Sequence, residues 1–198
     1  MDCSVTVHLI RHEKTQANLE RKYIGWTDEP IADAIDVEPF LQPALVYGSD
    51  LIRCKQTANA YFPQAEYRAN NQLRELHFGD FEMKTYEQLQ HNALYRAWID
   101  DPFQVTPPNG ESFTHFQARV VQAFQQIIHQ PDDYIFVVHG GVIRVLLAMF
   151  GQAQHHFQQI TAHHRTVYTL RWDSFDRLKE GARCTLYSEA HITGKGPL

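Results

Sequence analysis

The sequence predicts an α/β fold: a three-layer sandwich with a central, mostly parallel sheet, helices on both faces and a small helical flap. Three apolar runs predict it, because each is too short for a helix, ends in polar residues and precedes a helical pattern. They cover residues 4–10, 45–48 and 134–138. Alternating strands and helices favour a parallel sheet, whose ligands bind at the carboxyl ends of the strands. The polar residues that follow the three runs are therefore expected to lie close together at one edge of the sheet.

In the first run polar and apolar residues alternate, the last residues are apolar, and Arg11 and His12 follow directly. A guanidinium can donate two parallel hydrogen bonds to phosphate oxygens, and an imidazole can attack phosphorus as a nucleophile. Thr15 and Asn18 follow at a spacing that places a hydroxyl and an amide on the first helical turns, where backbone amides also face an anion. Taken alone, the Arg-His pair is weak evidence, because neither residue is rare.

The second run leads into a helix expected over 51–61, with Ser49 and Asp50 as its N-cap. Arg53 lies one turn into this helix and is a second candidate for binding phosphate oxygens. The alternative for a single arginine is a solvated charge on a helix surface.

The third run is the most apolar of the three and stops at His139, before a helix expected over 142–150. A polar residue at the carboxyl tip of such a strand is better placed for ligand contact than for packing. An amphipathic stripe over 112–129 predicts a covering helix. Residues 85–101 also have a helical pattern, which prolines end, and they belong to the expected flap. Two late alternating segments predict further strands, over 166–172 and 184–189.

Glu75 is a carboxylate within an otherwise apolar and turn-rich stretch, residues 73–79. Partial burial in such a stretch would suit a general acid. An ion pair with Arg74 or Arg68 is the alternative that this segment leaves open.

The bulk composition suits one domain, residues 1–198, with the flap over about 80–111 inserted above the site. The formal net charge of −5 gives no electrostatic pull toward nucleic acid or an anionic membrane. Three distant cysteines argue against a disulfide framework or a clustered zinc site. Without a signal segment or a membrane-length apolar run, we expect a cytoplasmic protein, monomer or homodimer. Two pairs of adjacent histidines lack a regular metal-ligand pattern and are expected at the surface or rim: His155-His156 and His163-His164.

Ordered sequence blocks connect these candidates. Residues 9–18 read LIRHEKTQAN, and the later blocks are GWTD at 25–28, SDLIRCKQTA at 49–58, LRE at 73–75, NGES at 109–112 and VHGGVIR at 138–144. In this order they resemble the motifs of the histidine phosphatase superfamily, which has the phosphoglycerate mutase-like fold and the signature Arg-His-Gly-x-Thr-x-x-Asn. The resemblance spans residues 5 to about 150.

The resemblance implies a role for each matched residue. It makes His12 the nucleophile that forms a phosphohistidine and Glu75 the proton donor, with His139 as a further catalytic residue. The implied phosphate pocket consists of Arg11, Asn18, Arg53, His139 and Gly140, with Thr15 and Gly25 as supporting residues. No metal or other cofactor is expected, because arginines supply the positive charge that magnesium supplies elsewhere.

Two features depart from the family pattern. The signature glycine is Glu13 here, which would be strained if the backbone required a positive φ, and which brings a carboxylate beside an anion site. Strand geometry lets this side chain point away from His12. The family's first helix is longer, whereas Pro39 and Pro43 predict a short or broken helix over 31–43.

The expected function is hydrolysis of the phosphate monoester of a small metabolite. Residues 78–84 are similar to a stretch of alpha-ribazole-5'-phosphate phosphatases, which makes alpha-ribazole 5'-phosphate a candidate substrate. The first alternative is a phosphoglycerate mutase, which needs further basic residues to recognise a carboxylate, and the flap offers few: Lys84, His91 and Arg96. The second alternative is a catalytically impaired protein that binds a phospho-ligand, suggested by Glu13 and the shortened first helix.

Overall fold

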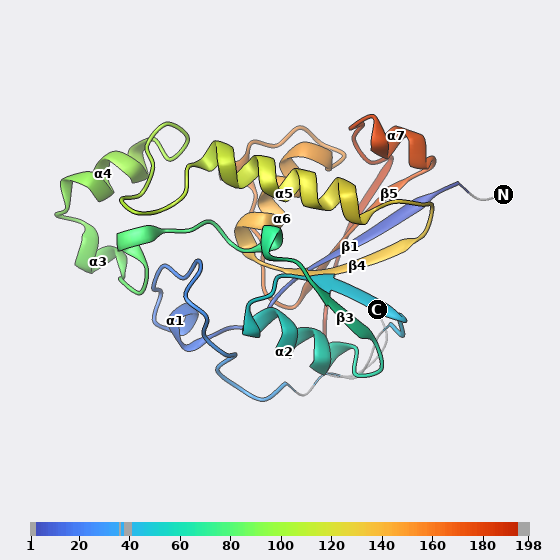
Figure 1. Cartoon of the computed structure of the whole chain (residues 1–198), viewed down its shortest axis with the longest axis horizontal. Coiled ribbons are helices and arrows are strands. Elements are labelled where there is room, and N and C mark those ends of the chain that lie inside the picture. Colours follow the sequence, from blue (N-terminus) through green and yellow to red (C-terminus); the bar gives the residue numbers. More distant parts are fainter. Residues whose placement is uncertain (1–2, 36, 38–40, 194–198) are drawn as a thin grey trace.

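A computed structural model describes residues 3–35, 37 and 41–193 (Figure 1). Its sheet contains β1 (Val5–Arg11), β2 (Leu45–Gly48), β3 (Glu66–Ala69), β4 (Asp133–Val138), β5 (Thr166–Trp172) and β6 (Leu186–His191). The strand order is β3-β2-β4-β1-β5-β6. Three of the five strand pairings are parallel, and β5 and β6 extend the sheet antiparallel. The prediction of a mostly parallel sheet is confirmed.

The two central strands divide their side chains between two buried cores. In β1, Val7 and Leu9 lie in one core and Ile10 lies in the other. In β4, Phe136 and Val137 are divided in the same way. Because neighbouring side chains of a strand point to opposite faces, a strand covered on both faces is apolar at nearly every position. This is why the third apolar run of the sequence has no polar interruption.

Helices cover both faces of the sheet, which confirms the predicted three-layer sandwich (Figure 1). On one face lie α5 (Phe113–Ile127), α6 (Gly140–Phe150) and α7 (Phe175–Lys179), and on the other lie α1 (Gln16–Leu19) and α2 (Ile52–Tyr61). The predicted apolar stripe of α5 faces the sheet, since Phe116, Val120 and Phe124 are fully buried.

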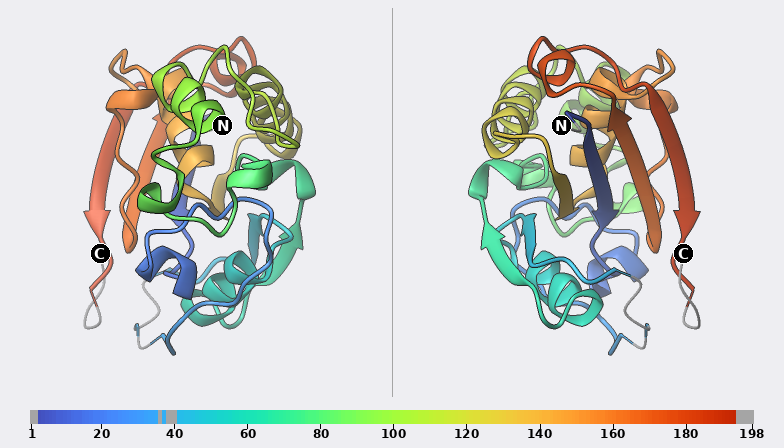
Figure 2. Two further views of the ribbon diagram at one scale, coloured as in Figure 1. Left: turned by 90° about the vertical axis from the view of Figure 1, so that its left-hand side faces the viewer. Right: turned by 90° about the vertical axis from the view of Figure 1, so that its right-hand side faces the viewer.

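The segment between β3 and α5 projects beyond the carboxyl ends of β1 and β4 (Figures 1 and 2). It contains α3 (Tyr86–Leu89) and α4 (Ala93–Asp100), so the prediction of one continuous helical stretch was wrong. The side chain of Asn92 accepts hydrogen bonds from the backbone amides of Leu94 and Tyr95, which starts a new helix. The function of this segment as a flap, and the single domain, stay predictions.

The N-cap predicted for α2 was also wrong. The capping position is Leu51, and the backbone amide of Ile52 donates to Oδ1 of Asp28 at 2.7 Å. Asp50 instead forms a two-fold hydrogen-bonded ion pair with Arg74. A cap supplied by a residue 24 positions earlier has no local sequence signal.

The short or broken helix expected over 31–43 falls partly outside the described residues. The described residues of this stretch contain no helix. None of the described helices combines the length and the apolar character that crossing a membrane requires.

Candidate active site

His12 follows the last residue of β1 and lies against the end of β4, where its backbone amide donates to the carbonyl of Val138 at 2.9 Å. The side chain is 3% exposed. Nδ1 lies 2.6 Å from the carbonyl oxygen of Glu13, so Nδ1 carries the proton and donates it, and Nε2 keeps the lone pair. Burial and the charges of Arg53 and Arg11 hold the pKa of His12 well below its usual value. The imidazole is therefore neutral and available as a nucleophile.

His139 lies beside His12, with ring centroids 5.1 Å apart in an edge-on arrangement. It follows β4 and occupies the N-cap position of α6. Its side chain is fully buried, and burial, followed by the charge of Arg53, holds its pKa well below the usual value. A neutral imidazole at this position can donate a hydrogen bond to a phosphoryl oxygen without adding a further buried charge.

Arg53 is a fully buried cation on the first turn of α2. Its terminal nitrogens donate to the carbonyl of Gly25 at 2.6 Å and of Thr27 at 2.9 Å. Within the described residues, its buried Nε has no hydrogen-bond partner. A buried guanidinium with an unsatisfied donor is costly unless an anion compensates it, so the alternative of a solvated helix charge does not apply.

Arg11 enters the site from the last position of β1. One terminal nitrogen donates to the carbonyl of Ala162 at 2.7 Å, and its buried Nε also has no partner among the described residues. The guanidinium packs on Gly140, where an added Cβ would lie 3.2 Å from Cζ of Arg11. Gly140 is the first residue of α6, whose N-terminal backbone amides favour negative charge.

Glu75 lies across the same end of α6. Its Oε2 accepts a hydrogen bond from the backbone amide of Gly141 at 2.8 Å, and Oε1 accepts one from Leu76 at 2.9 Å. A Cβ at position 141 would lie 2.1 Å from Oε1, so glycine is needed for this close approach. The ion pairs considered from the sequence are not made, because Arg74 pairs with Asp50 and Arg68 pairs with Glu66.

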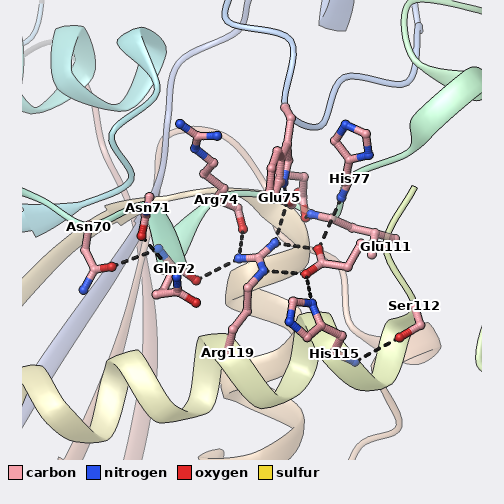
Figure 3. A network of polar contacts seen from close by, with 12 residues as sticks. Asn70, Asn71, Gln72, Arg74, Glu75, His77, Glu111, Ser112, His115 and Arg119 are labelled. Carbon is pink, nitrogen blue, oxygen red and sulfur yellow. Dashed lines mark hydrogen bonds and ion pairs between the residues drawn. The ribbon is translucent and has the colours of Figure 1, made fainter. Parts of the chain in front are cut away.

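Behind Glu75 lies a buried polar network centred on Arg119 of α5 (Figure 3). Arg119 forms two hydrogen bonds of 2.7 Å with the carboxylate of Glu111 and donates to the carbonyls of Gln72, Arg74 and Glu75 at 2.7 to 2.9 Å. The segment that carries Glu75 has no helix or strand to hold it, and the planar fork of Arg119 takes over that function.

Thr15 and Asn18 stabilise the loop that follows His12. Thr15 is the N-cap of α1, and its hydroxyl accepts from the amide of Asn18 while Oδ1 of Asn18 accepts from the amide of Thr15. This reciprocal pair is a capping box. A direct contact between Asn18 and phosphate stays a prediction.

Glu13 is buried and does not have a positive φ, so the backbone strain considered from the sequence does not arise. Its Oε1 accepts hydrogen bonds from the hydroxyl of Tyr61 at 2.6 Å and from Nε of Arg165 at 2.8 Å. These partners belong to α2 and to the segment before β5. Arg165 supplies the opposite charge and Tyr61 a hydrogen bond, whereas Arg11 and Arg53 form no ion pair with this carboxylate in the described part of the chain.

His164 is a site residue that sequence reasoning missed. Its Nδ1 lies 2.7 Å from the carbonyl oxygen of His12, and the two rings are 5.7 Å apart. It was expected at the surface or rim as one of a histidine pair, but it is half-buried against His12. The residues are 152 positions apart, and no motif connects them.

A cavity of about 380 Å³ lies beside Arg11 and Glu75. Gly140, Gly141 and Arg144 of α6 form one wall. Arg144 is the last residue of the sequence block at 138–144, and the sequence predicted no role for it. The cavity brings together two guanidinium groups, the carboxylate of Glu75 and the N-terminus of α6. Guanidinium groups and a helix N-terminus can bind the negative charge of a phosphate ester.

Comparison with known proteins is consistent with this geometry. Residues 7–180 match the histidine phosphatase superfamily (branch 1). The adenosylcobalamin/alpha-ribazole phosphatase of Escherichia coli (strain K12) is 31% identical over 168 residues, which cover 76% of this chain and 83% of the relative. The 2,3-bisphosphoglycerate-dependent phosphoglycerate mutase of Bartonella quintana (strain Toulouse) is 27% identical, covering 85% and 94%. The crystal structure of the alpha-ribazole phosphatase from Shigella flexneri superposes with a TM-score of 0.69 at 26% identity, covering 83% and 89%.

Proposed function

The chain belongs to the histidine phosphatase superfamily (branch 1), and from that premise we propose that it hydrolyses a small phosphate monoester through a phosphohistidine on Nε2 of His12. One observation carries the proposal: His12 is neutral, with Nδ1 engaged by the carbonyl of Glu13, and it lies among Arg11, Arg53 and His139. This combination supplies a nucleophilic lone pair next to groups that attract a phosphate dianion.

In the first step the phosphate binds to the guanidinium groups of Arg11 and Arg53, with neutral His139 on its side. Nε2 of His12 attacks phosphorus in line, so that the nitrogen–phosphorus bond forms as the bond to the ester oxygen breaks. Glu75 in its acid form gives its proton to the departing oxygen. The Nδ1 hydrogen bond to the Glu13 carbonyl stabilises the positive charge that develops on the imidazole.

In the second step water attacks the phosphohistidine. The carboxylate of Glu75 accepts a proton from this water, the nitrogen–phosphorus bond breaks, and inorganic phosphate leaves. His12 returns to its neutral form. The hydrogen bonds from Gly141 and Leu76 hold the Glu75 carboxylate in one position for both proton transfers.

For the substrate we propose alpha-ribazole 5'-phosphate first. Two observations support this substrate: the Escherichia coli relative is named an adenosylcobalamin/alpha-ribazole phosphatase, and residues 78–84 are similar to a stretch of alpha-ribazole-5'-phosphate phosphatases. A mutase relative also matches the chain. We favour hydrolysis over phosphoryl transfer between two positions of one substrate, because the segment over the site contributes few basic side chains to retain a phosphorylated product.

The mechanism is tested by replacing the nucleophile. His12→Ala should lower turnover of p-nitrophenyl phosphate by several powers of ten, the usual effect of removing a nucleophile. Quenching the wild type with labelled substrate in alkaline denaturant should trap a phosphoenzyme that is stable to base and labile to acid, and His12→Ala should not form it. His8→Ala is the matched control, because His8 is also on β1 but hydrogen-bonds Thr169 instead. A His12→Ala variant that keeps more than about a hundredth of the wild-type rate would contradict covalent catalysis by His12.

A further inference from the structure

Glu82 is a half-buried carboxylate in the segment between β3 and α5, and it has no part in the proposed mechanism. Its Oε1 accepts hydrogen bonds from the backbone amides of Trp26 at 2.8 Å and of Phe78 at 3.2 Å. Its Oε2 accepts from the backbone amide of Thr27 at 2.8 Å and from the hydroxyl of the same residue. Three of these four donors belong to the loop 25–28. The carboxylate therefore fixes this loop against the segment that carries Phe78.

The four hydrogen bonds also keep Glu82 ionised. Burial acts to raise the pKa of Glu82, but the hydrogen bonds from Thr27, Trp26 and Phe78 outweigh burial and hold this pKa below its usual value. Among residues 3–35, 37 and 41–193, no lysine, arginine or histidine lies within ion-pair distance of the carboxylate. The charge is stabilised by neutral donors, so Glu82 holds backbone in place and is not one half of a surface ion pair.

The loop 25–28 in turn holds Arg53 at both ends. The carbonyls of Gly25 and Thr27 accept hydrogen bonds from the two terminal nitrogens of the guanidinium, at 2.6 and 2.9 Å. Asp28 accepts from the first backbone amide of α2, directly before Arg53. Two oriented terminal nitrogens fix the plane of a guanidinium, and with it the position of the buried Nε, which has no partner in the described part of the chain.

We propose that Glu82 is a positioning residue for phosphate binding, which acts through the loop 25–28 on the guanidinium of Arg53. The chain of contacts has two steps, from the carboxylate to the loop and from the loop carbonyls to the guanidinium. Among the described residues, Glu82 makes no hydrogen bond to His12, His139 or Arg53 itself. The inference rests on the proposed function, because it takes Arg53 as a group that binds phosphate. Loss of the carboxylate should therefore weaken phosphate binding although every group that contacts phosphate is still present.

Inorganic phosphate is the probe for the first test, because its binding needs no turnover and calorimetry measures it directly. Glu82→Gln keeps the size of the side chain but offers one carbonyl oxygen to four donors, and its amide nitrogen cannot accept from them. The dissociation constant for inorganic phosphate should rise by about tenfold, the lower end of what a hydrogen bond between charged groups contributes. KM for p-nitrophenyl phosphate should rise with it, and kcat should change less. Glu82→Asp keeps a carboxylate and should recover part of the loss, and Glu87→Gln, an exposed glutamate of α3, is the matched control that should change neither constant.

A double-mutant cycle separates this path from a general loss of structure. Arg53→Lys keeps a positive charge but has no planar fork for the two loop carbonyls to orient. Adding Glu82→Gln to Arg53→Lys should therefore lower kcat/KM for p-nitrophenyl phosphate by less than about threefold, against about tenfold in the wild-type background. The same tenfold loss in both backgrounds would overturn the inference, because the effects of independent residues add.

Thr27→Val reaches the same contact from the loop and leaves the charge of Glu82 in place. It removes only the hydrogen bond of the hydroxyl, so the dissociation constant for inorganic phosphate should rise by about threefold. Thr27→Val also decides the question if Glu82→Gln does not fold, which circular dichroism would show. An unchanged dissociation constant in folded Thr27→Val and Glu82→Gln would overturn the inference. A wild type that neither binds inorganic phosphate nor hydrolyses p-nitrophenyl phosphate would instead refute the proposed function itself.

Discussion

Nε of Arg165 donates a hydrogen bond of 2.8 Å to Oε1 of Glu13, and this pair links the loop after His12 to the segment before β5. The hydroxyl of Tyr61 donates to the same oxygen, so the carboxylate has two partners other than Arg11 and Arg53. The next residue along from Arg165 is His164, which contacts the backbone of His12. A carboxylate at the usual glycine position is therefore compensated by residues from two distant elements.

Replacement of Glu13 separates its structural effect from catalysis. Glu13→Gly keeps the carbonyl that accepts from His12 but removes an acceptor from Tyr61, so the free energy of unfolding should fall by about 1–3 kcal/mol. Urea unfolding measures this loss, and kcat/KM for p-nitrophenyl phosphate should stay within about tenfold of wild type, since no transition-state contact is removed. A hundredfold fall in kcat/KM with the fold retained would give Glu13 a catalytic role.

Much of the fold was predictable because its signals are local. The three apolar runs with polar tips appear as β1, β2 and β4 followed by helices, and the carboxyl ends of β1 and β4 bring His12 and His139 together. Periodicity also predicted α5 and the two late strands β5 and β6, but not their antiparallel direction. Short β3 and α7 were not predicted, because four or five residues carry too little pattern.

The remaining parts of the site depend on contacts between distant residues. Asp28 caps α2, Arg119 holds the Glu75 segment, and His164 contacts His12 across 152 positions. No local motif predicts such pairs. The neutral state of His12 is also a tertiary property, since burial lowers its pKa more than any single neighbour does.

Arg119 is expected to position Glu75 without touching substrate. Arg119→Lys keeps a positive charge for Glu111 but cannot reproduce the fork that reaches the carbonyls of Gln72, Arg74 and Glu75. We expect a loss of about 1–3 kcal/mol in the free energy of unfolding, from carbonyls left without a donor. We also expect kcat for an alkyl phosphate to fall more than kcat for p-nitrophenyl phosphate. Arg96→Lys, an exposed arginine of α4, should change neither, and equal effects on both esters would limit Arg119 to a general structural role.

The buried histidines should make the fold sensitive to acid. Burial lowers the pKa of His164 to about 4, and the pKa values of His12 and His139 are lowered as well. Below pH 6.5 the unfolded chain then binds more protons than the folded chain, so the free energy of unfolding falls as the pH drops from about 6.5 toward 4. Each such histidine contributes a slope of up to about 1.4 kcal/mol per pH unit.

Urea unfolding at pH 7, 6 and 5 tests this origin of the pH dependence. His164→Asn removes one titrating group, so its free energy of unfolding should decline less steeply below pH 6.5 than that of the wild type. His163→Asn changes an exposed neighbour and should leave the slope unchanged. Parallel curves for wild type and His164→Asn would show that His164 does not take up a proton on unfolding.

Glu75 should matter most when the leaving group is poor. An alkyl alcohol leaves as an unstable alkoxide unless it is protonated, whereas p-nitrophenolate is stable enough to leave with little help. Glu75→Gln keeps the size of the side chain and an oxygen that can accept from Gly141, but it has no proton to deliver. Phosphoenzyme formation from an alkyl phosphate should slow by roughly 10²-fold or more, the usual contribution of general acid catalysis, and formation from p-nitrophenyl phosphate should slow much less.

Gly141→Ala provides an independent test of the same carboxylate. The added Cβ would lie 2.1 Å from Oε1 of Glu75, and the flexible end of that side chain can move aside without unfolding the protein. The acid group is then displaced while its chemistry is unchanged, so Gly141→Ala should show the same selective loss on alkyl phosphates. Single-turnover measurements are required, because hydrolysis of the phosphoenzyme can limit the steady state, and in the proposed mechanism Glu75 is the base of that step for either ester. If both esters slow equally in the first step in both variants, Glu75 holds the phosphate or the fold, and the acid must be another residue.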